Sequence, residues 1–178
     1  GLVGELLKRC ASVTATVRSS SSELAKLETE AKGRLRVITG IDITTPEHIE
    51  RLQKQVKDQS FDLIFLNAGI MRGKDVALGE VADADVTAMF LTNAIAPIRV
   101  ADRLAGLLAS GGTVAFMSSI LGSVSTNDNG WAELYRASKA ALNSLVRSFR
   151  ARHPQPDLTV LALHPGVVRT AMGGASAP

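Results

Sequence analysis

Apolar and polar positions along the chain follow two spacings. Short runs rich in β-branched and large apolar residues predict buried strands, and they lie at 12–17, 35–39, 61–66, 113–117 and 158–163. Stretches with apolar residues three and four positions apart predict helices, and they lie at 2–9, 23–31, 46–56, 84–109 and 131–152. Ser22 and Thr45 are the expected N-caps of the second and third helices. Strands and helices alternate, which predicts an α/β fold, a doubly wound parallel sheet with helices on both faces.

Length and composition narrow the class of protein. The chain has 178 residues, of which 46% are apolar, so we expect a single packed domain over 1–178. One cysteine excludes an intrachain disulfide and favours a reducing compartment, which predicts a cytoplasmic protein. No apolar run approaches the ~20 residues of a membrane span, so no membrane partner is expected.

Charge and side-chain chemistry exclude two kinds of site. The net charge is +3, the basic residues are scattered among acids, and aromatic residues make up 4%, which together disfavour nucleic-acid binding. The three histidines show no metal-ligand spacing, so no metal site is expected.

A small or polar group follows the predicted strands. Ligands of open α/β sheets bind at the carboxyl ends of the strands, so these groups are candidates for one shared cleft. In chain order they are Arg18, then Asp42 and Ile43, then Asn67, Ala68 and Gly69, then Ser119, and finally Pro165 and Gly166.

Tyr135 and Lys139 are four residues apart on a predicted helix, so they share one face of it. An ammonium beside a phenol is expected to lower the pKa of that phenol, which suits a general acid or base near neutral pH. Ser119 ends a predicted strand shortly before this helix, where its hydroxyl could hold a substrate oxygen against Tyr135. Taken singly, the same residues also fit a surface tyrosine beside a lysine and a serine in a turn.

Asn93 lies inside the long predicted helix, where asparagine is disfavoured. Pro97 follows four residues later and has no N–H, so the Asn93 carbonyl loses its helical partner. The freed carbonyl is suited to holding a water molecule, and the alternative is a helix that simply bends there.

These motifs occur in the order of the short-chain dehydrogenase/reductase family. The segments 117–124 and 135–143 resemble its single-domain carbonyl-reductase branch, and the resemblance covers essentially the whole chain. It implies a Rossmann-type fold and an oxidoreductase that transfers hydride between a nicotinamide cofactor and a small carbonyl compound or secondary alcohol. It also implies a homodimer or homotetramer that associates through the helices carrying Asn93 and Tyr135.

The resemblance implies a role for each matching residue of the catalytic set. Tyr135 would pass a proton to the carbonyl oxygen, and Ser119 would orient that oxygen. Lys139 would lower the pKa of Tyr135 and bind the ribose hydroxyls of the nicotinamide half. The Asn93 carbonyl would hold a water molecule that links Lys139 to a proton relay.

The same resemblance implies the cofactor contacts. Asn67, Ala68 and Gly69 would pack near the adenosine end, and Asp42 and Ile43 would bracket adenine. The segment that grips the nicotinamide carboxamide would contain Pro165, Gly166, Val168 and Thr170. An acidic residue at the end of the second family strand would repel a 2′-phosphate, whereas this chain has Arg18 there, which favours NADP(H) and leaves NAD(H) possible.

The sequence departs from the family pattern at both ends. A first strand and its glycine-rich turn, whose N–H groups hold the pyrophosphate, do not precede the helix at 2–9. Few residues follow Thr170, where the family continues to a last strand. We expect a Rossmann-type domain that is incomplete at both ends, with its strands divided into two half-sheets. A true truncation that binds no cofactor is the alternative.

Two other functional hypotheses stay open at this point. One is a non-catalytic dinucleotide-binding or signalling protein on the same scaffold, and the other is an unrelated doubly wound protein. The segment 126–130 resembles an insertion that either shapes the substrate pocket or forms a surface turn.

Overall fold

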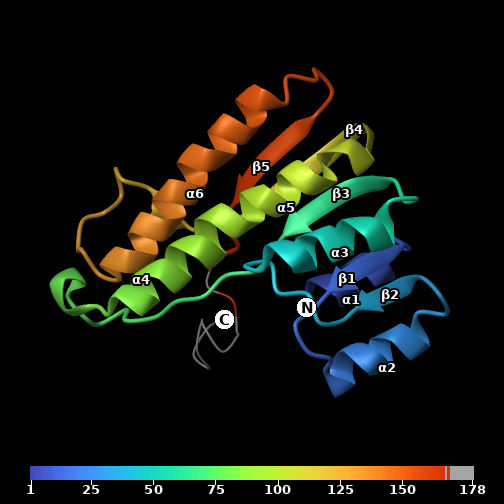
Figure 1. The fold of residues 1–178 in the computed structure, drawn as a ribbon, viewed down its shortest axis with the longest axis horizontal. Helices are drawn as coiled ribbons and strands as arrows, with labels where there is room; N and C mark the ends of the chain where they lie inside the picture. Colours follow the sequence, from blue (N-terminus) through green and yellow to red (C-terminus); the bar gives the residue numbers. More distant parts are fainter. Residues whose placement is uncertain (167, 169–178) are drawn as a thin grey trace. The chain divides into compact units, whose positions relative to one another are not determined.

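The computed structural model describes residues 1–166 and 168. The chain divides into two compact units, Gly1–Val56 and Lys57–Pro178, and each is described by itself (Figure 1). The single domain expected over 1–178 stays a prediction.

The first unit is a two-stranded parallel sheet with helices packed on it. Its elements in chain order are α1 (Leu2–Lys8), β1 (Val13–Thr16), α2 (Ser22–Glu30), β2 (Leu35–Ile38) and α3 (Pro46–Val56). The strands pair in register from Val13 beside Leu35 to Thr16 beside Ile38. Leu7 of α1 and Leu35 of β2 are buried in one cluster with Ala31, which explains why α1 and α2 form against this sheet.

Two helix starts in this unit test the predicted caps. Ser22 is the first residue of α2 rather than its cap, because the side chain of Ser21 accepts a hydrogen bond from Leu24 N. With this start, Leu24 packs against the buried cluster. The sequence pattern alone did not decide which of the two serines caps the helix. The backbone carbonyl of Thr45 accepts hydrogen bonds from His48 N and Ile49 N, as an N-cap carbonyl does before α3.

The second unit is a three-stranded parallel sheet in the order β3-β4-β5. Its elements are β3 (Phe61–Leu66), a 3₁₀ turn (Leu78–Glu80), α4 (Asp83–Phe90), a π-helical turn (Leu91–Ile95), α5 (Ala96–Leu104), a 3₁₀ turn (Ala105–Leu107), β4 (Leu108–Met117), a 3₁₀ turn (Ile120–Gly122), α6 (Glu133–Arg152) and β5 (Thr159–Leu163). α5 packs on β3 and β4, α6 packs on β5, and the two helices contact each other (Figure 1). Phe116 of β4 and Phe149 of α6 are fully buried, and their rings meet edge to face at 5.7 Å.

The strand pairing agrees with the predicted class. All neighbouring strands are parallel, which confirms the α/β doubly wound architecture with alternating helices. The described strands form two sheets, β1-β2 and β3-β4-β5, so the expected division into half-sheets is confirmed as well.

The helical stretch predicted over 84–109 is helical from Asp83 to Leu104, and it is interrupted near Asn93. The segment is α4, a π-helical turn and α5, because Pro97 has no N–H to donate to the Asn93 carbonyl and the hydrogen-bond ladder shifts. The helix also ends earlier than predicted, because Leu108 already pairs with Phe61 in the sheet. β4 therefore begins five residues before the predicted position 113, and its pairing with β3 contains a register irregularity between Phe61 and Leu63.

Candidate active site

The carboxyl ends of the three strands in the second unit meet at one edge. Leu66 pairs with Phe116, and Met117 pairs with Leu163, so all three strands end level with one another. The segments that leave this edge contain the predicted residues Asn67, Ala68 and Gly69 after β3, Ser119 after β4, and Pro165 and Gly166 after β5. This edge is where an open α/β sheet binds its ligand.

Tyr135 lies in the first turn of α6, against the segment that follows β4. Its side chain is only 8% exposed and belongs to an apolar cluster with Met89, Ala132 and Leu134. The Ser119 side chain accepts a hydrogen bond from Leu121 N, and its interaction with the Tyr135 hydroxyl lowers the pKa of that phenol. The structure thus brings Tyr135 and Ser119 together.

Lys139 follows one helical turn after Tyr135 and is buried beside it. Its side chain is 2% exposed, and Nζ lies 5.7 Å from the centroid of the Tyr135 ring. Nζ donates a hydrogen bond to the Met117 carbonyl at 2.7 Å. A Cβ added at Gly69 would lie 3.5 Å from Nζ, so this glycine brings the loop after β3 close to the ammonium.

Burial controls the electrostatics of this pair. Loss of hydration raises the pKa of Tyr135 above its ordinary value of 10.0, and the hydrogen bond with Ser119 opposes that rise. Loss of hydration also lowers the pKa of Lys139 from 10.5 to about 8. The net shift in the pKa of Tyr135 is upward because desolvation dominates, and the lowering by Lys139 that the resemblance implies stays a prediction. At neutral pH the Tyr135 hydroxyl therefore keeps its proton.

The Asn93 side chain fastens the loop after β3 to the helices. It is fully buried, its Oδ1 accepts from Ile70 N at 2.8 Å, and its Nδ2 donates to Ile70 O at 2.8 Å. Nδ2 also donates to Ser138 Oγ on α6 at 3.0 Å. Sequence reasoning considered the carbonyl of Asn93 and missed this side-chain clasp, which the spacing along the chain does not reveal.

Replacing Asn93 with alanine is expected to lower the free energy of unfolding by about 1–3 kcal/mol, because the partly buried N–H and C=O of Ile70 would lose their partners. Chemical denaturation measures this change. Asn127→Ala is the matched control, since Asn127 makes an exposed loop hydrogen bond to Gly130 N, and it should cost less than about 1 kcal/mol. Equal losses in both variants would contradict the clasp.

Gly122 and Asn143 position Lys139 and were missed by the sequence reasoning. A Cβ at Gly122 would lie 2.9 Å from both the backbone C and the Cβ of Lys139, so only glycine allows this approach. Asn143 Nδ2 donates to Gly122 O at 3.2 Å, and Asn143 Oδ1 accepts from Ser118 Oγ at 2.6 Å. The four-residue spacing from Lys139 to Asn143 was a usable signal, whereas nothing distinguished Gly122 from other loop glycines.

Three predicted cofactor residues lie in the first unit, after its strands. Arg18 is exposed, and Ile43 is half-buried. Asp42 Oδ1 accepts from Thr44 Oγ1 at 2.7 Å and from Thr44 N at 2.9 Å. These hydrogen bonds, helped by the charge of Arg18, hold the pKa of Asp42 below its usual value. Asp42 N also donates to His48 Nδ1, which makes His48 part of this turn.

The predicted carboxamide-binding segment follows β5. Pro165, Gly166 and Val168 are exposed, and Gly166 has a φ of 76°, a left-handed conformation that favours glycine. Thr170 lies outside the described residues.

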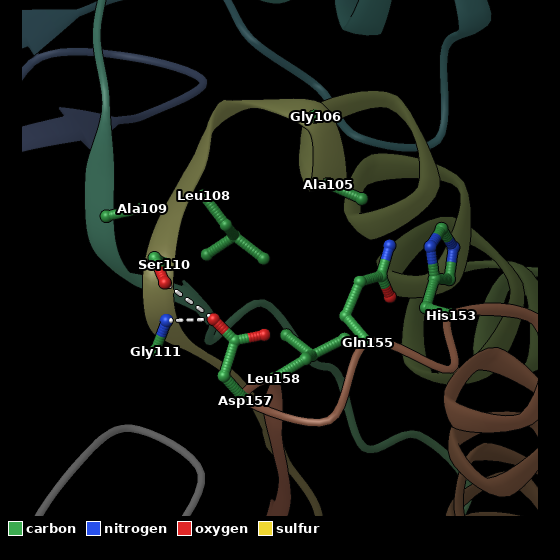
Figure 2. A pocket seen from close by; sticks show the side chains of 10 residues that line it. All are labelled: Ala105, Gly106, Leu108, Ala109, Ser110, Gly111, His153, Gln155, Asp157 and Leu158. Carbon is green, nitrogen blue, oxygen red and sulfur yellow. Dashed lines mark hydrogen bonds between the residues drawn. The ribbon is translucent and has the colours of Figure 1, made fainter.

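A hollow among the described residues lies away from these candidates. A cavity of about 280 Å³ lies near the amino ends of β4 and β5, and Figure 2 shows its lining side chains. There Asp157 Oδ2 accepts from Ser110 Oγ at 2.7 Å and from Gly111 N at 2.9 Å, which fixes the start of β4. These bonds lower the pKa of Asp157. None of the candidate residues lines this cavity, so it is not the candidate site.

Residues 1–166 and 168 contain neither a candidate membrane span nor a candidate metal cluster. No helix there is long and apolar enough to cross a membrane. In the same part of the chain, no group of three or more His, Cys, Asp or Glu side chains could hold a metal ion.

Comparison with known proteins gives one family. A family model described as short chain dehydrogenase matches residues 1–178. C-signal of Myxococcus xanthus is 44% identical over 119 residues, which are 65% of this chain and 70% of that protein. A short-chain dehydrogenase/reductase of Burkholderia multivorans solved with bound NADP is 42% identical, with a TM-score of 0.94 over 99% of this chain and 78% of that one.

A third relative is a carbonyl reductase of Pseudomonas aeruginosa PAO1 solved in complex with NADP. It is 40% identical, with a TM-score of 0.88 over 99% of this chain and 77% of that one. The chain spans about two thirds of the length of the curated relatives it matches, from 62% to 70% for the two most significant.

Proposed function

This chain belongs to the short-chain dehydrogenase family, and on that premise we propose that it works as an NADP(H)-dependent oxidoreductase acting on a small carbonyl compound or secondary alcohol. The observation that carries the proposal is the contact between the Tyr135 hydroxyl and Ser119, with the Lys139 ammonium buried one turn away. A protonated phenol, a hydroxyl and an ammonium side by side suit proton transfer to a carbonyl oxygen.

Each residue of the catalytic set has a distinct task in this proposal. In the reducing direction Tyr135 Oη donates its proton to the substrate oxygen, and in the oxidising direction it accepts that proton back. Ser119 Oγ donates a hydrogen bond to the same oxygen and so fixes the substrate beside Tyr135. Lys139 supplies positive charge next to the phenolate that forms. The carbonyl of Asn93 remains our candidate for holding a water molecule in the proton path to Lys139.

The residues around Lys139 fit a nicotinamide dinucleotide. An ammonium has three N–H donors, and the hydrogen bonds recorded among the described residues use one of them, to Met117 O. The other two can meet the hydroxyls of a ribose. When bound, the nicotinamide supplies or accepts the hydride. Asn67 and Ala68 are proposed to contact the adenosine end, and Pro165, Gly166, Val168 and Thr170 the carboxamide.

The choice of NADP(H) over NAD(H) rests on Arg18. Its guanidinium is exposed at the end of β1, where a 2′-phosphate would be read by charge-assisted hydrogen bonds. Asp42 and Ile43 follow β2 and are proposed to bracket the adenine. The two relatives of known structure described above, from Burkholderia and Pseudomonas, are complexes with NADP, which supports the same choice.

The proposal is tested by titrating the full-length protein with NADPH and separately with NADH, followed by nicotinamide fluorescence. Arg18→Gln is expected to weaken NADPH binding about 10- to 100-fold and to leave NADH binding unchanged, because only the phosphate loses a charged partner. Arg9→Gln is the matched control, since Arg9 is an exposed arginine paired with Glu5. Equal weakening of both cofactors, or none, would remove Arg18 from the phosphate site.

A second candidate function is a non-catalytic dinucleotide-binding or signalling protein on the same scaffold. The observation in its favour is the 44% identity to a relative named C-signal. The two functions differ in turnover, so NADPH binding without oxidation of NADPH by any carbonyl compound would favour the second one.

The oligomeric state and the cellular location of the protein stay predictions. We propose a homodimer or homotetramer through the helices that carry Asn93 and Tyr135, and sedimentation of the full-length protein tests it. A cytoplasmic location is proposed from the single cysteine and is tested by fractionation.

A further inference from the structure

Trp131 is the only tryptophan of the sequence, and its exposed ring is held at three points. The side chain is 41% exposed, yet Nε1 donates to Asp75 Oδ1 at 2.9 Å. Its backbone is fixed too, because Trp131 N donates to Asn129 Oδ1 at 3.1 Å and Arg136 Nε donates to Trp131 O at 2.7 Å. A large apolar surface that stays exposed while it is anchored in this way is suited to contact with a ligand.

Trp131 joins the two loops that border the candidate active site. Asp75 lies in the segment between β3 and α4, and Trp131 lies in the segment between β4 and α6; both segments lie near the start of α6 (Figure 1). A second hydrogen bond connects the segment before α4 to α6, because Leu78 N donates to Glu133 Oε2 at 3.0 Å. Both segments leave the strand edge that carries Ser119. The hydrogen bond between Trp131 and Asp75 therefore connects two loops that border this edge.

The turn that carries Trp131 is held in a costly conformation. Ala132 has a left-handed φ of 59°, although it is not glycine and is buried against Tyr135. Arg136 is 7% exposed, and its Nη1 is buried with no hydrogen-bond partner in the structure. Its remaining donors hold the turn through Trp131 O and Asn129 Oδ1. Such outliers persist where the arrangement serves a function, and here they fix the position of the indole ring.

Other exposed apolar side chains lie along the same two loops. We define the apolar rim as Val76, Leu78, Ile120 and Trp131, all exposed large apolar residues. Ile120 directly follows Ser119, and Ala132, next to Trp131, packs with Tyr135. The charged groups beside the rim are engaged, because Asp75 accepts from Trp131 and Glu133 accepts from Leu78 N. The Lys74 ammonium, 6.0 Å from the centroid of the indole ring, is paired with Asp75. The rim therefore offers apolar contact rather than an unpaired charge.

We propose that Trp131 is a specificity-determining residue of this site, whose anchored ring forms a rigid apolar wall beside Tyr135 and selects carbonyl compounds that carry a flat apolar group. The inference rests on the proposed oxidoreductase function. A ring held in place by Asp75 and Arg136 loses little freedom when it contacts an aryl group, so the contact favours the aryl substrate by up to about tenfold.

The test compares the full-length protein with Trp131→Ala and Trp131→Phe, using acetophenone and butanone as substrates for NADPH oxidation. In the alanine variant kcat/KM for acetophenone should fall about five- to tenfold, mainly through KM, while kcat/KM for butanone stays within twofold. The phenylalanine variant, which keeps an aromatic ring, should retain most of the preference. Equal losses for both substrates in the alanine variant would overturn the proposal and leave Trp131 a structural residue.

Asp75→Ala tests the anchoring separately, because it frees the indole without removing it. The preference for acetophenone should fall by severalfold, and the emission of Trp131 should shift to the red as the ring becomes more hydrated. Asp128→Ala is the control, since it removes an exposed carboxylate from the segment before Trp131 and leaves the hydrogen bond between Asp75 and Nε1 in place. An unchanged preference in Asp75→Ala would show that the wall needs no anchor and would overturn that part of the proposal.

Failure of the enzyme proposal is distinguishable from failure of this one. If the protein oxidises NADPH with neither ketone, the emission of Trp131 still reports contact when phenylethanol or butanol is added. A shift to the blue with phenylethanol alone supports the apolar wall even in a non-catalytic protein. Absence of any shift with phenylethanol overturns the wall, whatever the activity.

Discussion

Replacing Tyr135 with phenylalanine should lower kcat/KM for carbonyl reduction by about a thousandfold, because the proposed proton donor is removed while the ring remains. The ring packs with Met89, Ala132 and Leu134, so the variant should fold as the unchanged protein does. The dissociation constant for NADPH should change less than threefold, since Lys139 and Arg18 are untouched. Stopped-flow single turnovers measure the chemical step directly and separate it from binding.

Ser119→Ala gives the matched comparison for this prediction. It removes a hydrogen-bond donor to the substrate oxygen but leaves the proton donor, so its loss should be smaller, about tenfold to a hundredfold. More than a tenth of the activity remaining in Tyr135→Phe would mean that another group protonates the substrate. Because burial raises the pKa of Tyr135, activity in the oxidising direction should increase with pH, and Tyr135→Phe should lose that increase.

The elements that sequence reasoning placed well are those whose pattern is local. β3 is a short run dominated by large apolar residues, and α3 begins at a proline in its first turn. Both elements have the predicted bounds. The helix with Tyr135 and Lys139 keeps an apolar stripe over its 20 residues, so its face toward the sheet could be assigned. The order of polar groups at strand ends was equally readable, because each strand ends where its apolar run stops.

Features that depend on distant pairing could not be predicted in the same way. The start of β4 is decided by the pairing of Leu108 with Phe61, some 47 positions away in the chain. Pro97 signalled a disturbance near Asn93, but a bend and a π-helical turn satisfy the same missing N–H. Ser21 and Ser22 are chemically equal caps, and the packing of Leu24 chooses between them.

In the candidate site, too, the sequence indicated which residue types are present but not how they are buried or what they contact. Residue types identified Ser119, Tyr135 and Lys139 as candidates, whereas the burial of Tyr135 and Lys139 came only from the structure. That burial reverses the expected direction for the pKa of Tyr135, since an ammonium in the sequence pattern carries no information about lost hydration. Gly122 shows the limit most clearly, because its contact with Lys139 joins two segments that nothing in the sequence brings together.

Replacing Lys139 with methionine should stabilise the protein at neutral pH and greatly weaken turnover. Burial lowers the pKa of Lys139 from 10.5 to about 8, which corresponds to about 3 kcal/mol of lost stability when the amine is charged. Methionine removes that cost but also the hydrogen bond to Met117 O, which is worth about 1 kcal/mol. The expected gain at pH 7 is therefore about 2 kcal/mol, while activity falls about a hundredfold or more.

The pH dependence distinguishes a buried charge from ordinary repacking. Between the folded pKa of about 8 and the unfolded value of 10.5, the unfolded state of the wild-type protein binds more protons than the folded state. Its free energy of unfolding therefore rises with pH in this window, and the advantage of Lys139→Met shrinks to nothing by about pH 10.5. Urea unfolding followed by Trp131 emission measures both proteins at pH 7 and pH 10. An advantage that stays constant across this window would mean that the pKa of Lys139 is the same in the folded and the unfolded protein, so that the gain comes from repacking and not from removal of a buried charge.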